Sequence, residues 1–206
     1  KILDKAGLNA TWTVCGQALQ KAPWLAEAIT ARGDEPCNHG HKWAFTAFMD
    51  EDEETAFIKK GTDSIAETCG RPPVGWLSRY LHTDITRRIL KEQGYLYHMD
   101  DYSDDFPYWA DVEMKDGSRE PMVILPYAID SNDMKFWLSP SFTPDMWLSY
   151  AKHTFNWLLR IIGRPGRIDA FQHFLDHVKA HKDVWIATRE EIAQHFAANV
   201  PPGENS

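Results

Sequence analysis

The run PMVILPY at residues 121–127 is continuously apolar, a pattern typical of a β-strand that is buried on both faces. Such strands belong to sheets that are covered by helices on either side. Three further segments favour strands because they are rich in β-branched and aromatic residues. They are NATWTV at 9–14, YLYHMD at 95–100 and DVWIA at 183–187. A short extended segment is also expected directly before His39.

Segments with helical periodicity separate these strands. The predicted helices cover residues 17–33, 50–70, 83–94, 143–163, 167–182 and 188–198. Thr188 and Glu191 have the spacing of a capping box. Pro144 suits the first position of its helix, and Thr83 or Asp84 is the expected N-cap of another. Capping residues thus predict where several helices begin, in addition to the periodicity that predicts the helices themselves.

Strands that alternate with helices predict an α/β protein with a parallel sheet, either open or closed as a barrel. A chain of 206 residues is long enough to form one substantial domain. We expect that domain to cover residues 1–198 and a tail to cover 199–206. In both architectures, sites form where strands end and loops begin.

Composition excludes several classes of protein. The 22 basic and 30 acidic residues give a net charge of −8 without a basic stripe, so we expect no nucleic-acid partner. No apolar run is long enough to span a bilayer, and we expect no membrane partner. Cys15, Cys37 and Cys69 are widely spaced and form no CxxC pair. They argue against a disulfide framework and favour a reducing compartment, for which we predict the cytoplasm.

Four loops rich in polar and aromatic residues follow predicted strands: NHGHKW at 38–43, GRPPVGW at 70–76, HMDDYSDDFPYW at 98–109 and DSNDMKFW at 130–137. In a strand, His39 and His41 would face the same side and could share an ion. Gly40 between them favours a bend, and a third ligand would have to come from a distant loop. The spacing alone leaves a metal, an acid–base and a structural role open.

The ordered set of segments resembles the polysaccharide deacetylase superfamily, whose NodB-type domain is a distorted (β/α) barrel. The resemblance is carried by GLNATWTVCGQ, GDEPCNHGHKW, RPPVGW, DDYSDDFPYW, DSNDMKF and the segment from GRPGRIDAF to EEIAQHF, and it covers nearly the whole chain. The similarity is closest to the metal-independent allantoinase and cyclic-imide hydrolase branch. It implies a barrel that is incomplete, because the strand with the catalytic aspartate and a later strand with a histidine have no counterpart here. Leu158 falls nearest to that histidine.

The resemblance also indicates which residues occupy the positions of the zinc ligands in related deacetylases. Zinc deacetylases of the superfamily place two ligand histidines four residues apart, and these positions fall on His39 and Trp43. An indole cannot ligate zinc, so we expect no metal cofactor. If zinc is bound nevertheless, His39 and His41 are its predicted ligands.

By the same resemblance, His39 and Arg71 are the predicted catalytic residues, His39 in acid–base work and Arg71 in orienting site carboxylates. The predicted substrate-binding residues are Trp43, Trp76, Asp105, Tyr108 and Trp109.

The resulting hypothesis is a hydrolase of non-peptide C–N bonds that uses a water nucleophile. Its expected substrate is a small-molecule cyclic ureide or imide, as in allantoinases. The first alternative is a polysaccharide N-deacetylase that acts on N-acetyl sugars of the chitin or peptidoglycan type. The second is a catalytically degenerate relative that binds or scaffolds. The resemblance further implies a homo-oligomer.

Overall fold

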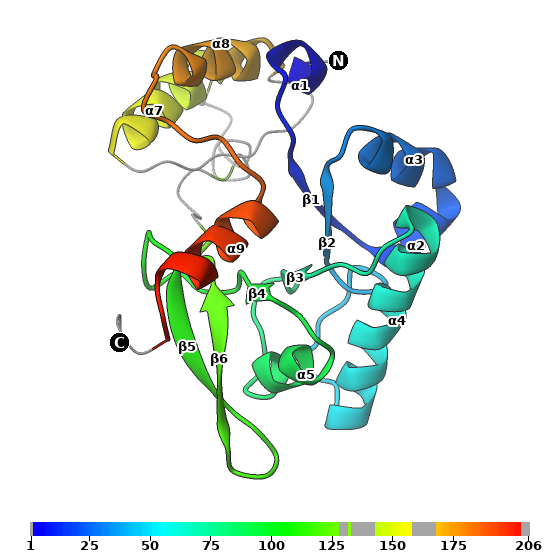
Figure 1. Cartoon of the computed structure of the whole chain (residues 1–206). Coiled ribbons are helices and arrows are strands. Elements are labelled where there is room, and N and C mark those ends of the chain that lie inside the picture. The colour runs from blue at the N-terminus through cyan, green and yellow to red at the C-terminus, as the bar shows by residue number, and fades with distance from the viewer. Residues whose placement is uncertain (1, 128–131, 133–142, 158–167, 203–206) are drawn as a thin grey trace. The chain divides into compact units, whose positions relative to one another are not determined.

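The computed structural model describes residues 2–127, 132, 143–157 and 168–202 (Figure 1). The chain divides into two compact units. The larger contains residues 9–126 and 187–206, and the smaller contains residues 1–8 and 127–186. That residues 1–198 form a single domain stays a prediction.

A six-stranded sheet forms the centre of the larger unit (Figure 1). Its strands are β1 (Thr11–Val14), β2 (Glu35–Asn38), β3 (Gly75–Trp76), β4 (Tyr97–His98), β5 (Tyr108–Glu113) and β6 (Arg119–Ile124), in the order β1-β2-β3-β4-β6-β5. All neighbours pair in parallel except β5, which is antiparallel to β6. Within the described residues β1 and β5 are the two edges, so this sheet is open. The prediction of an α/β fold with an incomplete barrel is confirmed.

Helices connect the parallel strands, as right-handed crossovers require. They are α2 (Gly16–Lys21), α3 (Pro23–Ala31), α4 (Glu51–Cys69) and α5 (Thr86–Glu92). A further helix of this unit, α9 (Arg189–Asn199), lies near the end of the chain and follows all the strands. Asp50 and Glu53 form a capping box at the start of α4. Gly70 ends this helix in the left-handed conformation, with φ 75°. The predicted capping box of Thr188 and Glu191 is confirmed at α9.

The prediction of one helix over 17–33 was wrong, because the segment forms two helices. Pro23 has no N–H to donate and disfavours helical geometry at the residue before it. Ala22 accordingly has φ −132° and ψ 68°, and α3 begins at Pro23. The predicted strand over 183–187 was also wrong, because the structure assigns no strand to these residues. A β-rich composition yields a strand only where a partner strand lies alongside.

Two further details differ from the sequence-based expectation. The loop at 98–109 was not expected to contain a strand, yet its end forms β5 and makes a hairpin with β6. The N-cap of α5 is Ile85, not Thr83 or Asp84. The hydroxyl of Thr83 instead donates a 2.7 Å hydrogen bond to the buried carboxylate of Glu54, so it is engaged elsewhere.

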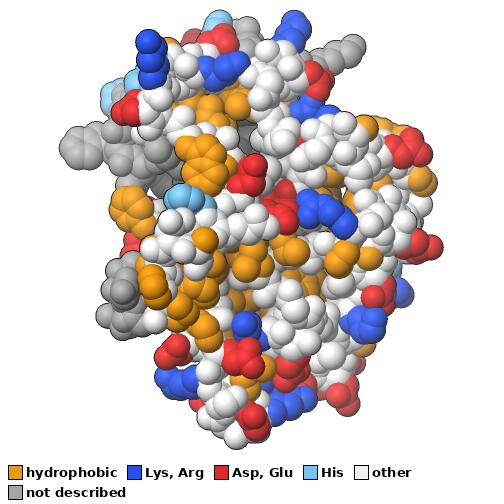
Figure 2. Space-filling model, in the orientation of Figure 1, with side chains coloured by type: hydrophobic (Ala, Val, Ile, Leu, Met, Phe, Trp, Pro, Cys, Tyr) orange, Lys and Arg blue, Asp and Glu red, His pale blue; other side chains and the backbone are white. Residues whose placement is uncertain are grey.

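Two apolar clusters hold the larger unit together. One joins the sheet to α4 and α5, with Ile58, Trp76 and Leu90 among its buried members. The other packs α2 and α3 against α4 through residues such as Leu19 and Ile65. On the outside, acidic and basic side chains are interspersed around the β5–β6 hairpin (Figure 2). The sheet and the helices of the larger unit are thus packed together through buried apolar side chains.

The smaller unit consists of α1 (Ile2–Ala6), α7 (Pro144–Trp157) and α8 (Ile168–Lys179). Trp147 and Phe155 of α7 pack edge-to-face against Phe174 of α8. Pro144 begins α7 as predicted. The predicted continuation of this helix to residue 163 and most of the DSNDMKFW loop lie outside the described residues. None of the helices in the described part of the chain has the length and apolar character that a membrane span requires.

Candidate functional site

Strand register brings several loops together at the carboxyl edge of the sheet. Asn38, Trp76, His98 and Ile124 are successive register partners across β2, β3, β4 and β6. Because these strands are parallel, the residues that follow them emerge at the same edge. The loops after β2, β3 and β4 therefore lie side by side at this edge, where several polar side chains come together.

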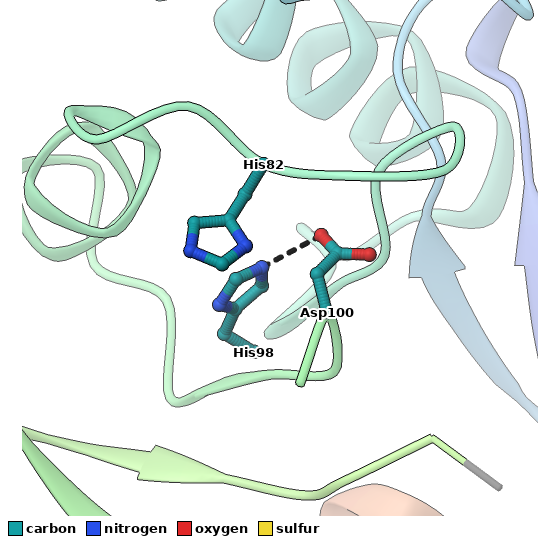
Figure 3. Close-up of side chains that lie close together, drawn as sticks. All are labelled: His82, His98 and Asp100. Atoms are coloured by element: carbon teal, nitrogen blue, oxygen red, sulfur yellow. Dashed lines mark hydrogen bonds and ion pairs between the residues drawn. The ribbon is translucent and has the colours of Figure 1, made fainter. Parts of the chain in front are cut away.

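The central contact at this edge joins His98 and Asp100. The Nε2 atom of His98 lies 2.7 Å from Oδ2 of Asp100, and both side chains are fully buried (Figure 3). The backbone N–H of Ser78 donates to both oxygens of Asp100, at 3.0 and 2.7 Å. On the other side of the ring, Arg87 donates from Nε to Nδ1 of His98 at 3.3 Å. Nδ1 is thus an acceptor, and the ring proton is on Nε2 and directed to Asp100.

These contacts explain why Asp100 is charged although it is buried. Burial by itself raises the pKa of the Asp100 carboxyl. The hydrogen bonds from His98 and from Ser78 outweigh this effect, so the pKa is lowered overall. Asp100 is accordingly a carboxylate at neutral pH, and it fixes the orientation of the His98 ring.

His82 lies against this pair. Its ring is 5.0 Å from that of His98 and nearly perpendicular to it (Figure 3). Among the described residues, no group forms a hydrogen bond with its buried Nδ1 atom. Burial lowers the pKa of His82, and the neighbouring His98 and Arg87 lower it further. His82 is thus a neutral imidazole with one nitrogen unengaged.

His39 emerges at the same edge, at the end of β2. Its Nδ1 lies 2.5 Å from the carbonyl oxygen of Leu77, which can only accept, so Nδ1 carries a proton. The Nε2 atom of a neutral His39 is then available to exchange a proton. The buried Asn38 anchors this loop, because its Oδ1 accepts from the N–H of Gly40 and its Nδ2 donates to Tyr95. The strand end thus presents His39 in a fixed orientation.

His41 faces a different partner from His39. Its Nδ1 lies 3.3 Å from the hydroxyl of Ser64 on α4, and its pKa is lowered by burial and then by Lys60 and Lys42. The described Nδ1 atoms of His39 and His41 thus have different partners, and a shared metal ion stays a prediction. Trp43, at the position of the second deacetylase ligand, brings no donor atom.

Within the described residues, one other group of side chains has metal-ligand character: the nitrogens and oxygens of His82, His98 and Asp100 lie within 4.8 Å of one another. Their present arrangement does not fit a cation. The Nε2 proton of His98 occupies the line to Asp100, and the Arg87 guanidinium lies against the opposite ring nitrogen. We therefore assign no metal-binding role to this group of side chains.

Two of the predicted substrate-binding tryptophans have opposite environments. Trp43 is 58% exposed, and the Arg79 guanidinium lies 4.5 Å from the centre of its ring. Trp76 is completely buried and donates from Nε1 to the hydroxyl of Ser78. Trp43 is therefore accessible at the carboxyl edge. Trp76 belongs to the core, and its hydrogen bond to Ser78 holds the start of the loop after β3.

The other predicted substrate-binding residues lie along the loop before β5 and on β5 itself. Asp105 is exposed in this loop. Tyr108 begins β5, and its hydroxyl lies 3.3 Å from that of Ser103. Trp109 donates from Nε1 to the carbonyl of Val200, and its ring packs on that of Phe196 in α9. Trp109 thus joins the last helix to the hairpin, and its role in substrate binding stays a prediction.

Arg71, the second predicted catalytic residue, is not brought to His39. It precedes β3, and its Nη1 donates to the carboxylate of Glu190 at 2.8 Å. The N–H of Glu190 in turn donates to Glu35, the first residue of β2. Arg71 therefore lies at the amino edge of the sheet, opposite the edge that presents His39. It does pair with a carboxylate, but that carboxylate is at the start of α9.

Sequence reasoning missed most of the polar groups at the carboxyl edge: Ser78, Arg79, His82, Arg87, His98 and Asp100. A signal was present for two of them, since His98 lies in the strand predicted at 95–100 and Asp100 is its last residue. The loop at 98–109 was one of the four candidate loops, but the sequence does not reveal that its first residues are buried, as the structure shows.

Comparison with known proteins agrees with this architecture. A family model described as polysaccharide deacetylase matches residues 1–98. A curated protein from Schizosaccharomyces pombe, named "Putative polysaccharide deacetylase", is 30% identical over 219 residues, which are 92% of this chain and 68% of that protein. The crystal structure of Puue allantoinase is 31% identical, with a TM-score of 0.84 over 97% of this chain and 71% of its own. A "probable Polysaccharide deacetylase" from Pseudomonas aeruginosa PAO1 is also 31% identical, with a TM-score of 0.83 over the same shares.

Proposed function

The chain belongs to the polysaccharide deacetylase family, and on this premise we propose that it hydrolyses the acetamide bond of an N-acetyl sugar. In this reaction water adds to the acetyl carbonyl carbon, the C–N bond breaks, and the nitrogen leaves as an amine with a proton. The products are acetate and a deacetylated sugar. The substrate class follows from the names of the family and of the relatives, two of which are described as polysaccharide deacetylases.

The observation that carries the proposal is the orientation of His39 at the carboxyl edge. A histidine that protonates a departing nitrogen needs one ring nitrogen that is free to carry the proton to the substrate. The contact between Nδ1 and the Leu77 carbonyl holds the ring so that Nε2 is the atom that exchanges protons. We assign His39 the role of taking up a proton from the attacking water at Nε2 and then giving it to the leaving amine.

The neighbouring polar groups support this assignment by fixing the loops. The next residue after Leu77 is Ser78, whose N–H is bound by Asp100, and Asp100 is bound by His98. The carbonyl that orients His39 is thus joined through one peptide unit to the buried Asp100 carboxylate and its hydrogen-bond partner His98. This arrangement limits the movement of the loop that positions the acid, as an acid–base site requires.

A second candidate function is hydrolysis of a cyclic ureide or imide. It is favoured by the similarity to Puue allantoinase, with 31% identity over 97% of this chain. The residue Trp43 in place of a second ligand histidine suits this candidate as well. The bond that is broken is again an amide C–N bond, so His39 would have the same role. The two candidates differ in what surrounds the amide.

The test is a comparison of substrates on the full chain. N-acetylated chitooligosaccharides and peptidoglycan fragments are assayed for acetate release, and allantoin and succinimide for ring opening. We expect acetate release, and a fall in kcat of at least about 100-fold in His39→Asn, the usual contribution of one acid–base group. His153→Asn is the matched control, because His153 is an exposed histidine on α7 that contacts its own helix. Turnover of the cyclic amides alone would establish the second candidate, and turnover of no substrate would contradict both.

A further inference from the structure

Arg79 lies among three aromatic rings at the carboxyl edge of the sheet. Its guanidinium carbon is 4.5 Å from the ring centre of Trp43 and 5.2 Å from those of Phe45 and Tyr80. Phe45 and Tyr80 are stacked on each other, with 5.1 Å between their centres. Rings at these distances attract the cation and hold its plane in place. The guanidinium is thus positioned without a salt bridge.

Among the described residues, no carboxylate pairs with Arg79. Its Nη1 donates a 3.3 Å hydrogen bond to the carbonyl of Trp43, and its buried Nε has no hydrogen-bond partner. By contrast, Arg71, Arg87 and Arg88 each form an ion pair with a carboxylate at 3.0 Å or less. In a chain with 30 acidic residues, a guanidinium that is held in place and left unpaired has an unused capacity for an anion.

Two contacts tie this guanidinium to the proposed acid. His39 binds the carbonyl of Leu77, two residues before Arg79, and Arg79 binds the carbonyl of Trp43, four residues after His39. The loop after β2 and the loop after β3 are thus joined twice. A ligand that rests on Arg79 consequently lies beside the loop that presents His39.

The rings around Arg79 are accessible to such a ligand. The side chains of Trp43, Phe45 and Tyr80 are 58%, 39% and 51% exposed. Tyr80 has φ 71°, a conformation that costs free energy for a residue with a side chain. Its carbonyl accepts a hydrogen bond from the hydroxyl of Tyr102. The loop is therefore held in a shape that keeps large aromatic faces next to a cation.

We propose that Arg79 is an anion subsite and that the substrate is an N-acetyl sugar that carries a carboxylate. The carboxylate binds the guanidinium through its free N–H groups, and the apolar faces of the sugar stack on the exposed rings. This inference rests on the proposed function and deepens it, because it distinguishes acidic from neutral sugars. Arg79 is in this view a specificity residue and takes no part in proton transfer.

The first experiment measures binding without turnover. Calorimetric titration of the full chain compares N-acetylmuramate with N-acetylglucosamine, which has the same acetamide but lacks the carboxylate. We expect N-acetylmuramate to bind at least about tenfold more tightly, the difference made by a hydrogen bond to a charged group. Arg79→Gln should abolish this preference, and Arg79→Lys should retain part of it because lysine keeps the charge but not the planar fork.

Arg119→Gln is the matched control, because Arg119 lies on the exposed β5–β6 hairpin beside Asp111. Its affinity for N-acetylmuramate should equal that of the unmodified chain. Thermal unfolding of each variant shows whether a lost preference reflects a lost fold. Equal affinity of the unmodified chain for the two sugars, or an unchanged preference in a folded Arg79→Gln, would overturn the subsite.

The second experiment measures turnover. If both proposals hold, kcat/KM for acetate release is higher on muramate-containing fragments than on chitooligosaccharides, and Arg79→Gln removes the difference. Turnover that ignores the carboxylate contradicts the subsite and leaves the deacetylase proposal intact. Carboxylate-dependent binding without any acetate release contradicts the deacetylase proposal and supports the anion subsite.

Discussion

Nε2 of His98 and Oδ2 of Asp100 are 2.7 Å apart, and neither side chain has any exposure to solvent. One residue separates the two in the sequence, yet their contact also involves the neighbouring loop after β3. Asp100 also accepts the N–H of Ser78, the residue that follows the carbonyl to which His39 is bound. The pair is therefore the connection between the end of β4 and the loop after β3.

Asp100→Asn is expected to destabilise the fold and to weaken catalysis together. The amide keeps the shape of the side chain but turns an N–H donor towards either Ser78 or His98, which both donate. The expected loss is about 1–3 kcal/mol in the free energy of unfolding, measured with a chemical denaturant. The acetate-release assay should show a reduced kcat. Asp111→Asn, at an exposed carboxylate of β5, is the control and should leave both quantities close to unchanged.

The sequence predicts the elements of the larger unit well where local signals agree. The helix closed by Gly70 and the capping box at Thr188 occur as expected. The strand predicted at 121–127 occurs as β6, which begins earlier, at Arg119, and ends earlier, at Ile124. The two errors have different causes, one local and one tertiary. A proline divides the first predicted helix, and the β-rich segment at 183–187 forms no strand.

The candidate site was predicted only in part for a similar reason. His39 directly follows β2 and Trp43 lies in the same loop, and both were identified through the resemblance to the deacetylase family. Arg71 was expected at the same place, but the chain turns it to the amino edge, where Glu190 binds it. Arg79 could not be distinguished from a surface arginine, because its unpaired state depends on rings from two separate loops. Register across the sheet supplies this information, and no local pattern contains it.

We predict that a chelator leaves the activity unchanged. His39 binds a backbone carbonyl and His41 faces α4, while Trp43 has no ligand atom. The measurement is acetate release before and after dialysis against EDTA, together with elemental analysis of the protein. Stoichiometric zinc that is absent from His39→Asn, combined with activity that zinc restores, would contradict this prediction.

Gly61→Ala is expected to destabilise the protein and to disturb the loop that presents His39. A Cβ atom at this position of α4 would lie 2.7 Å from Oδ1 of Asn38 and 2.9 Å from the backbone of Gly40. Overpacking of this kind costs about 1–3 kcal/mol, although alanine is the better helix former. Denaturant unfolding measures the loss. Lys60→Ala, at the exposed neighbouring position, is the control and should be close to neutral.

The pH dependence of stability should report the cluster around Glu51. Hydrogen bonds from Arg88 and then from Lys115 lower the pKa of Glu51 to about 2. Because the unfolded chain binds the proton more readily, this contact stabilises the fold above the unfolded pKa and is lost as the pH falls towards 2. The unmodified chain should therefore exceed Glu51→Gln in free energy of unfolding at pH 7, by a small amount because the pair is exposed. The difference should shrink between pH 5 and pH 2 and in high salt. A difference that is independent of pH would show that Glu51 acts through packing and that its charge has no part.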